Sequence, residues 1–212
     1  DIHHIYTGRG EANFFIFPDA TTMLIDAGDH DPAYEDFPYM TKPMPDKSRR
    51  SGEWIARYIE RTNPNKTKVD YLMASHFHSD HTGSINSNAA MTSGPNPDYK
   101  LVGMAEVGEW IQFGTSFDRG YPNYNYPNIV NDAHTQNYLA FIKHHVEHHG
   151  MKQEEFKVGK LNQISLKYKP EKYNKLFSIR NLAANGEIWN REDNTTIRYY
   201  DLNPINIEGR QN

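Results

Sequence analysis

The sequence predicts an α/β fold in which strands and helices alternate along a chain of 212 residues. Three observations support this prediction. Two runs of β-favouring residues flank a tight turn near the N-terminus, an amphipathic helical pattern follows at 51–62, and a short apolar run at 69–74 leads into a cluster of histidines. A chain of this length can bury a core of its own. We therefore expect one domain over residues 1–212.

The N-terminal part of the chain is typical of a β-hairpin. Residues 13–17 and 21–25 favour strands, and a Pro-Asp-Ala sequence between them favours a tight turn. The acidic and small residues of Asp26-Ala27-Gly28-Asp29 then end the second strand and open a loop. His3 and His4 most simply belong to a further strand at the N-terminus.

A surface connection, a helix and a strand are expected next. Residues 31–47 contain four prolines and show little periodicity, so they predict a long connection. Apolar residues at helical spacing predict an amphipathic helix over 51–62, which Asn63-Pro64 ends. The apolar run at 69–74 has the length of a buried strand.

The remainder of the chain alternates between loop-like and periodic stretches. Residues 86–128 are rich in Gly, Pro, Asn and Tyr, and we expect a loop-rich insertion there. Helical periodicity over 132–149, followed by Gly150 at a C-cap position, predicts a second helix. Residues 163–168 and 176–182 favour strands, and the sequence beyond them is mostly polar.

Composition narrows the classes of partner and compartment. The formal net charge is −4 and the basic residues are scattered, so a nucleic-acid partner is not favoured. This composition favours a small-molecule or phosphoester substrate. No apolar run approaches the roughly 20 residues of a membrane-spanning helix, and we expect a soluble protein. Because the sequence begins at Asp1 rather than Met, both a cytoplasmic location and export after leader removal stay open.

The sequence His76-Phe77-His78-Ser79-Asp80-His81 is the motif that points to chemistry. It places four ligand-type side chains within six residues, directly after the predicted strand at 69–74. A turn after a strand can bring such side chains onto one cation. Since cysteine is absent, the ligands are imidazoles and carboxylates, which suit one or two zinc ions and also manganese or iron.

The His-x-His-x-Asp-His motif, preceded by a hairpin that ends in Asp-Ala-Gly, resembles the metallo-β-lactamase superfamily. The resemblance implies an αββα sandwich and a hydrolase that uses a metal-bound hydroxide. It also implies that His76 and His78 hold a first metal, that Asp80 and His81 hold a second, and that Asp80 orients or activates the catalytic water. Asp26 would support the site, and a plain turn-capping role is the alternative.

Two further segments are similar to the hydrolase domain of bacterial DNA-uptake competence proteins. They are Asp118-Arg119-Gly120-Tyr121 and the Asn-Leu-Ala-Ala-Asn-Gly sequence at 181–186. This similarity implies a phosphoester substrate, whereas the superfamily as a whole implies an ester, lactone, thioester or amide. Tyr121, Tyr124 and Tyr126 are candidates to line a substrate cleft, and packing among themselves is the alternative.

The family pattern continues with another histidine, a Gly-Asp at a strand end and a final histidine, and this chain departs from it. No histidine follows His149, and Asp193 and Asp201 are not in a Gly-Asp pair. We therefore expect that 1–212 holds only the N-terminal part of the sandwich; a complete protein with an altered site is the alternative. An exposed sheet edge would then favour a homo-oligomer that covers it. The competing function is a non-catalytic metal-binding or interaction module with an incomplete site.

Five other histidines are weaker candidates for metal ligands. Pairs four residues apart on the helix at 132–149 face the same way and can chelate a cation, but residues of this kind more often pack or face solvent. One histidine near the start of that helix is a candidate for the missing third ligand. These residues are His134, His144, His145, His148 and His149.

Overall fold

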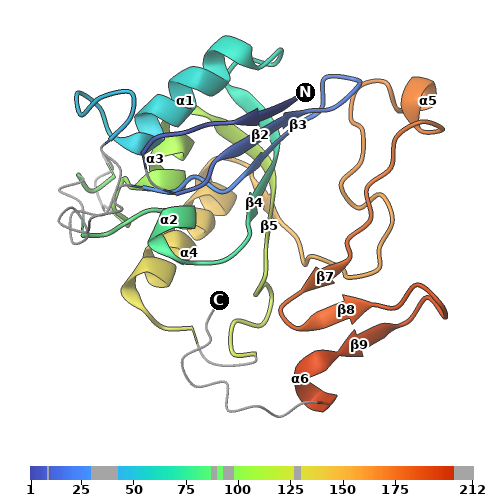
Figure 1. The fold of residues 1–212 in the computed structure, drawn as a ribbon. Coiled ribbons are helices and arrows are strands. Elements are labelled where there is room, and N and C mark those ends of the chain that lie inside the picture. The colour runs from blue at the N-terminus through green and yellow to red at the C-terminus, as the bar shows by residue number, and fades with distance from the viewer. Residues whose placement is uncertain (9, 30–42, 87–89, 93–97, 127–129, 203–212) are drawn as a thin grey trace.

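A mixed six-stranded sheet forms the centre of the molecule (Figure 1). The computed structural model describes residues 1–8, 10–29, 43–86, 90–92, 98–126 and 130–202. The strands lie side by side in chain order. The second strand is antiparallel to the first and the third, and the third to the sixth are parallel to one another. They are β1 (Ile2–His4), β2 (Asn13–Ile16), β3 (Thr22–Ile25), β4 (Lys68–Ala74), β5 (Gln112–Asp118) and β6 (Lys152–Gln153).

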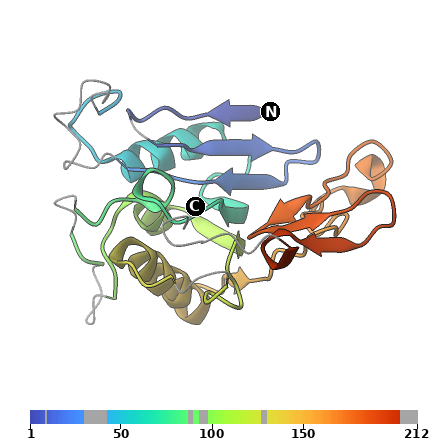
Figure 2. The ribbon, with the colours of Figure 1, turned by 60° about the horizontal axis from the view of Figure 1, so that its bottom comes forward.

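Helices cover one face of this sheet (Figures 1 and 2). The main core lies between the sheet and these helices. There, alternate strand residues such as Leu24, Leu72 and Phe113 pack against the apolar sides of the helices. The side chain of Asp132 caps the last of these helices by accepting a hydrogen bond from the Thr135 backbone N–H at 2.9 Å. The helices are α1 (Ser51–Thr62), α2 (Ser79–Thr82), α3 (Gly103–Trp110) and α4 (Ala133–His148).

The C-terminal segment lies against the opposite face of the sheet (Figure 2). Ile164 and Phe156 pack there on Met23, Tyr71 and Phe117 from the central strands. A small antiparallel sheet follows and stands beside the main sheet. The elements of this segment are α5 (Pro170–Tyr173), β7 (Ala183–Ala184), β8 (Glu187–Trp189), β9 (Thr196–Arg198) and α6 (Tyr199–Leu202).

The architecture confirms the α/β class and several of the predicted elements. The hairpin, the helix at 51–62, the strand at 69–74 and the helix at 132–149 correspond to β2 with β3, α1, β4 and α4. The N-terminal strand with His3 and His4 is β1. The αββα sandwich and the homo-oligomer stay predictions, and most of the predicted connection at 31–47 lies outside the described residues.

Two local predictions are wrong. The predicted loop-rich insertion at 86–128 contains α3 and the central strand β5, whose glycine and small polar residues obscure its strand character. Neither 163–168 nor 176–182 forms a strand. Residues of the first segment are instead held by hydrogen bonds to side chains. Ser165 N–H donates to the Tyr71 hydroxyl at 3.0 Å, and Lys167 N–H donates to Thr21 Oγ1 at 2.7 Å. The apolar alternation at 163–168 therefore reflects the burial of alternate side chains and not backbone pairing in a β-sheet.

Within the described residues, no helix is both long and apolar enough to span a bilayer.

Candidate metal centre

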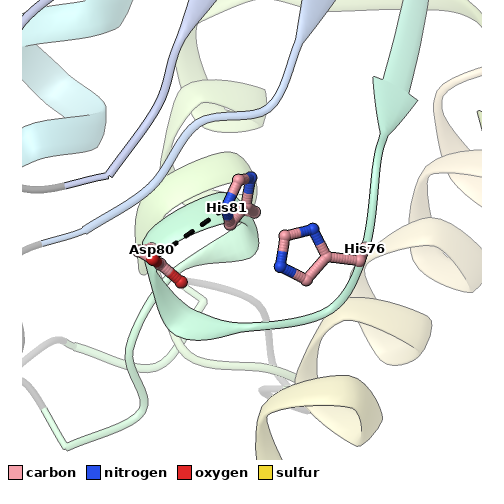
Figure 3. A group of neighbouring side chains, drawn as sticks. All are labelled: His76, Asp80 and His81. Atoms are coloured by element: carbon pink, nitrogen blue, oxygen red, sulfur yellow. Dashed lines mark ion pairs between the residues drawn. The ribbon is translucent and has the colours of Figure 1, made fainter. Parts of the chain in front are cut away.

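The histidine motif follows β4 directly and wraps into α2 (Figure 3). Backbone hydrogen bonds tie this turn to the Asp-Ala-Gly-Asp loop after β3. Ala27 N–H donates to the His81 carbonyl at 2.8 Å, and Asp29 N–H donates to the Ser79 carbonyl at 3.1 Å. The histidine motif at 76–81 and the loop at 26–29 are therefore adjacent, and their backbones are hydrogen-bonded to each other.

Two glycines allow the close approach of these segments. A Cβ atom on Gly28 would lie 1.9 Å from the Asp80 carbonyl oxygen, and one on Gly10 would lie 2.3 Å from the same atom. Neither distance is compatible with a side chain. The N–H of Glu11, which follows Gly10 in the chain, donates to the Asp80 carbonyl at 2.9 Å. The backbone of Asp80 is thus fixed from two sides.

His76, Asp80 and His81 bring one ligand atom each to within 4.8 Å of one another (Figure 3). The ring centroids of His76 and His81 are 3.8 Å apart, and Asp80 Oδ2 lies 3.9 Å from His81 Nε2. All three side chains are partly buried. This is the arrangement that imidazole and carboxylate ligands require for a shared cation.

His78 lies beside this group but does not join it. Its side chain is exposed, and its ring centroid is 4.9 Å from that of His76. The prediction that His76 and His78 share one metal while Asp80 and His81 share another therefore stays a prediction. The side chains that the structure brings together are His76, Asp80 and His81.

A buried carboxylate, Asp26, stands behind the histidines. Its Oδ1 accepts a hydrogen bond from Ser75 N–H at 2.8 Å, and its Oδ2 accepts from the Ser75 hydroxyl at 2.6 Å and from His81 Nδ1 at 2.8 Å. A carboxylate only accepts, so His81 donates through Nδ1 and, in the neutral ring, keeps its lone pair on Nε2. Asp26 is thus the positioning group that the sequence suggested, and more than a turn cap.

Ser75 fixes the second ring in the same way. Its hydroxyl has one proton, which goes to Asp26, so the 3.2 Å contact to His76 Nδ1 has the imidazole as donor. The lone pair of His76 then lies on Nε2 as well. Sequence reasoning missed Ser75, although its place between a strand end and the first histidine was a usable signal. Outer partners of this kind orient ligating histidines in metal sites.

The electrostatic environment differs between the two histidines. Burial lowers the pKa of His76, and the neighbouring rings of His81 and His78 lower it further. Burial acts in the same direction on His81, but the hydrogen bond to Asp26 and the negative charges of Asp26 and Asp80 outweigh it and raise the pKa. The lowered pKa of His76 favours its neutral form, which is the form that binds a metal.

Glu11 belongs to a second group of candidate ligands, which shares His81 with the first. Its carboxylate, one oxygen of Asp26 and a nitrogen of His81 also lie within 4.8 Å of one another. Asp26 is buried and already accepts from Ser75 and His81, so it is the weaker candidate for direct ligation. Glu11 is exposed, and no sequence motif indicated a ligand role for it.

The other predicted histidines lie apart from this centre. His134 Nδ1 accepts from Ile85 N–H at 3.4 Å, and His144 Nδ1 contacts Asp98 Oδ2 at 3.0 Å. His145 is buried in the core, whereas His148 and His149 are exposed. Among the residues that the structure describes, none of these belongs to a group with metal-ligand spacing.

The tyrosines of the 118–126 region have divided roles. Tyr124 donates to Asp118 Oδ2 at 2.8 Å and so packs within the protein. Tyr121 and Tyr126 line a small cavity of about 140 Å³ together with Arg119. The cleft prediction for these two residues stays open.

Comparison of the chain with protein-family models, curated proteins and solved structures found no match in any of the three.

Proposed function

We propose that this chain is a metal-dependent hydrolase domain of the kind that the metallo-β-lactamase resemblance implies. One observation carries the proposal: His76, Asp80 and His81 converge, and Ser75 and Asp26 turn the lone pairs of both imidazoles to Nε2. Outer hydrogen-bond partners of this kind orient ligating imidazoles in metal sites.

The ligand set fits zinc best, and manganese or iron also accept imidazole and carboxylate ligands. A divalent cation supplies Lewis acidity and lowers the pKa of water. Asp80 is only partly buried at the same centre, so it is placed to orient a water molecule and accept its proton. Asp26 and Ser75 hold the imidazoles in the required tautomer. The substrate class is a phosphoester or a small ester, lactone or amide.

Metal binding by the purified chain tests the first half of the proposal. After chelator treatment, zinc is titrated back and its stoichiometry and affinity are measured by calorimetry and elemental analysis. We expect at least one tightly bound ion per chain, and its loss in both His76→Ala and His81→Ala. His148→Ala is the matched control, because it removes an exposed imidazole outside the group. Unchanged zinc binding in His76→Ala and His81→Ala would contradict the proposal.

Turnover tests the second half. The zinc-loaded chain is assayed with bis(p-nitrophenyl) phosphate and with p-nitrophenyl acetate, and Asp80→Asn is assayed in parallel. We expect hydrolysis of at least one substrate and, because general acid–base groups contribute about 100- to 10,000-fold, a loss of that order in Asp80→Asn.

A non-catalytic metal-binding module is the second candidate function. The observation that favours it is that His76, Asp80 and His81 come from one short segment, and that among the described residues no ligand-type side chain from the C-terminal half joins them. Stoichiometric zinc without turnover of these two substrates, or of a lactone and an amide assayed in the same way, would establish this alternative and exclude the hydrolase.

A further inference from the structure

A cavity of about 270 Å³ opens beside the candidate metal centre. Ser75, whose hydroxyl contacts His76 and His81, forms part of its wall. The wall also contains Arg119 and Asn185. These two residues belong to the segments 118–121 and 181–186, which the sequence analysis singled out separately and which the metal centre does not use. The fold brings both segments to one place.

Arg119 is held in position by contacts that leave part of its guanidinium without a partner. Its Nη1 donates to Asn185 Oδ1 at 2.6 Å, and the guanidinium carbon lies 5.1 Å from the ring centroid of Phe77, the residue between His76 and His78. The Asn185 amide is itself fixed, because its Nδ2 donates to the Tyr126 carbonyl at 2.7 Å. The buried Nε of Arg119 has no hydrogen-bond partner in the described part of the chain.

No carboxylate neutralises this cation through a direct ion pair in the described residues. The neighbouring Asp118 is occupied by other donors: its Oδ1 accepts from the N–H groups of Gly120 and Tyr121, each at 2.8 Å, and its Oδ2 accepts from Tyr124 at 2.8 Å and Tyr138 at 3.2 Å. Burial lowers the pKa of Arg119, although a guanidinium stays charged at neutral pH. A half-buried cation with an unpaired N–H is destabilising, because burial removes water from the guanidinium without supplying a protein partner for every N–H.

We propose that Arg119, fixed by Asn185, is an anion-binding subsite of this cavity and takes the phosphate group of a phosphoester. A planar guanidinium presents parallel N–H donors that match phosphate oxygens, and Ser75 lines the same cavity on the side of the metal centre. Anion binding stands on this geometry alone. Its assignment to the substrate rests on the proposed hydrolase function, for which it selects the phosphoester class over neutral esters, lactones and amides.

The test is binding of phenyl phosphate to the chelator-treated, metal-free chain, with benzoate as the carboxylate of matched size. NMR reads out both the affinity and the N–H resonance of Arg119 Nε, which we expect to shift on saturation with phenyl phosphate. Because a hydrogen bond to a charged group contributes about 1.5–3 kcal/mol, Arg119→Gln should weaken phenyl phosphate binding about tenfold or more. Arg57→Gln, which removes an exposed arginine of α1 that lines neither cavity, should leave it unchanged.

A second variant guards against misfolding of Arg119→Gln. Asn185→Asp keeps Arg119 but places a carboxylate next to its Nη1, so an internal ion pair should displace phenyl phosphate and abolish the shift of the Nε resonance. Circular dichroism and thermal unfolding verify the fold of each variant. Equal affinity in wild type, Arg119→Gln and Asn185→Asp would overturn the subsite, and tighter binding of benzoate than phenyl phosphate would overturn the phosphate assignment.

The two proposals fail separately. Phenyl phosphate binding that depends on Arg119, in a chain that takes up no zinc, would retain the subsite and remove the hydrolase. Zinc binding that depends on His76 and His81, together with phenyl phosphate binding indifferent to Arg119, would do the reverse.

Discussion

Two segments of this chain are rich in histidine, and they differ in what stands behind the imidazoles. The strand-end histidines are His76, His78 and His81; the helix histidines are His144, His145, His148 and His149. In the first segment, Asp26 and Ser75 accept from the Nδ1 atoms of two rings. In the second, His144 contacts Asp98, an exposed partner.

The difference teaches that proximity of imidazoles is not sufficient evidence for a metal site. Ring centroids of the helix histidines approach to 4.6 Å, which is comparable with the 4.9 Å between His76 and His78. What distinguishes the strand-end segment is a buried carboxylate, Asp26, that accepts from His81 directly and is linked to His76 through the Ser75 hydroxyl. A nearby carboxylate, Asp80, also lies at metal-ligand spacing from both rings. The following predictions test whether this distinction governs behaviour in solution.

The largest expected effect comes from His145, the helix histidine that belongs to the core. Burial, and then the neighbouring His149 and His144, lower its pKa from 6.5 to about 3. The folded state therefore keeps His145 neutral while the unfolded chain takes up a proton below pH 6.5, so stability is complete above that pH and falls as pH drops towards about 3. For a pKa lowered from 6.5 to about 3, at about 1.4 kcal/mol per pKa unit, the loss reaches about 5 kcal/mol once the pH has fallen to about 3.

Chemical denaturation of wild type and His145→Leu between pH 7 and pH 4 measures this effect. Leucine retains packing against Phe141 and removes the titration; it also removes the 3.2 Å contact to the Tyr99 hydroxyl, at a cost of about 1 kcal/mol at neutral pH. The acid slope should flatten in His145→Leu and persist in His148→Leu. Identical slopes in wild type and His145→Leu would show that the ring is not held neutral by the core.

Gly28→Ala should have the next largest effect. The added Cβ would lie 1.9 Å from the Asp80 carbonyl oxygen, and overpacking of this kind costs about 1–3 kcal/mol or more. Because the displaced backbone carries Asp80, zinc affinity should fall together with stability. Denaturant unfolding and zinc titration measure the two quantities.

Gly150→Ala is the matched control for this variant. Gly150 has a φ of +70°, so alanine is strained there by about 1 kcal/mol, but no atom lies within 4 Å of the new Cβ and the residue is remote from the histidine motif. It should lower stability and leave zinc affinity intact. If Gly28→Ala binds zinc like wild type, the close approach of the two loops does not position the ligands.

Strong periodic patterns made most of the helix-covered half of the fold predictable. Helix α1 has apolar residues at helical spacing, and strand β4 is mostly apolar apart from Lys68 and Asp70. Asp132 and Gly150 mark the ends of α4. Strand β5 escaped prediction because close packing there selects small residues: a Cβ on Gly114 would lie 2.6 Å from the Asp70 carbonyl oxygen. A strand buried on both faces and tightly paired need not look apolar in sequence.

The candidate site was predictable as a motif but not as a geometry. The order of residues identified His76, Asp80 and His81, and flagged Asp26. It did not indicate that the Ser75 hydroxyl connects Asp26 to both rings, or that Arg119 meets Asn185 across 66 positions of chain. These contacts depend on tertiary packing, which local sequence patterns do not report.

Asp26→Asn tests the support behind the strand-end histidines directly. The amide nearly preserves shape, but it has one accepting oxygen where Asp26 has two. An NH₂ group then faces either the Ser75 N–H or the two donors at Oδ2, which are His81 Nδ1 and the Ser75 hydroxyl, and in both orientations His81 loses its negatively charged partner. Loss of such an outer partner lowers metal affinity about 10- to 100-fold. Zinc competition with a chromophoric chelator measures the change. Asp132→Asn, which replaces another hydrogen-bonded carboxylate but remains a good helix cap, should leave zinc affinity unaffected.

The smallest effect is expected from the double variant His144→Ala, His148→Ala. Both rings lie at the helix surface, and the 3.0 Å contact of His144 with Asp98 is between partly exposed groups, so stability should change by less than about 0.5 kcal/mol. The stoichiometry and affinity of tight zinc binding should equal those of wild type, because these imidazoles lack a buried carboxylate that fixes their tautomers. Weak zinc uptake at millimolar concentrations should decrease, since exposed histidines one helical turn apart do chelate cations loosely. Loss of one tightly bound ion in this variant would reverse the comparison and assign the metal to α4, and the double variant therefore decides between the two segments.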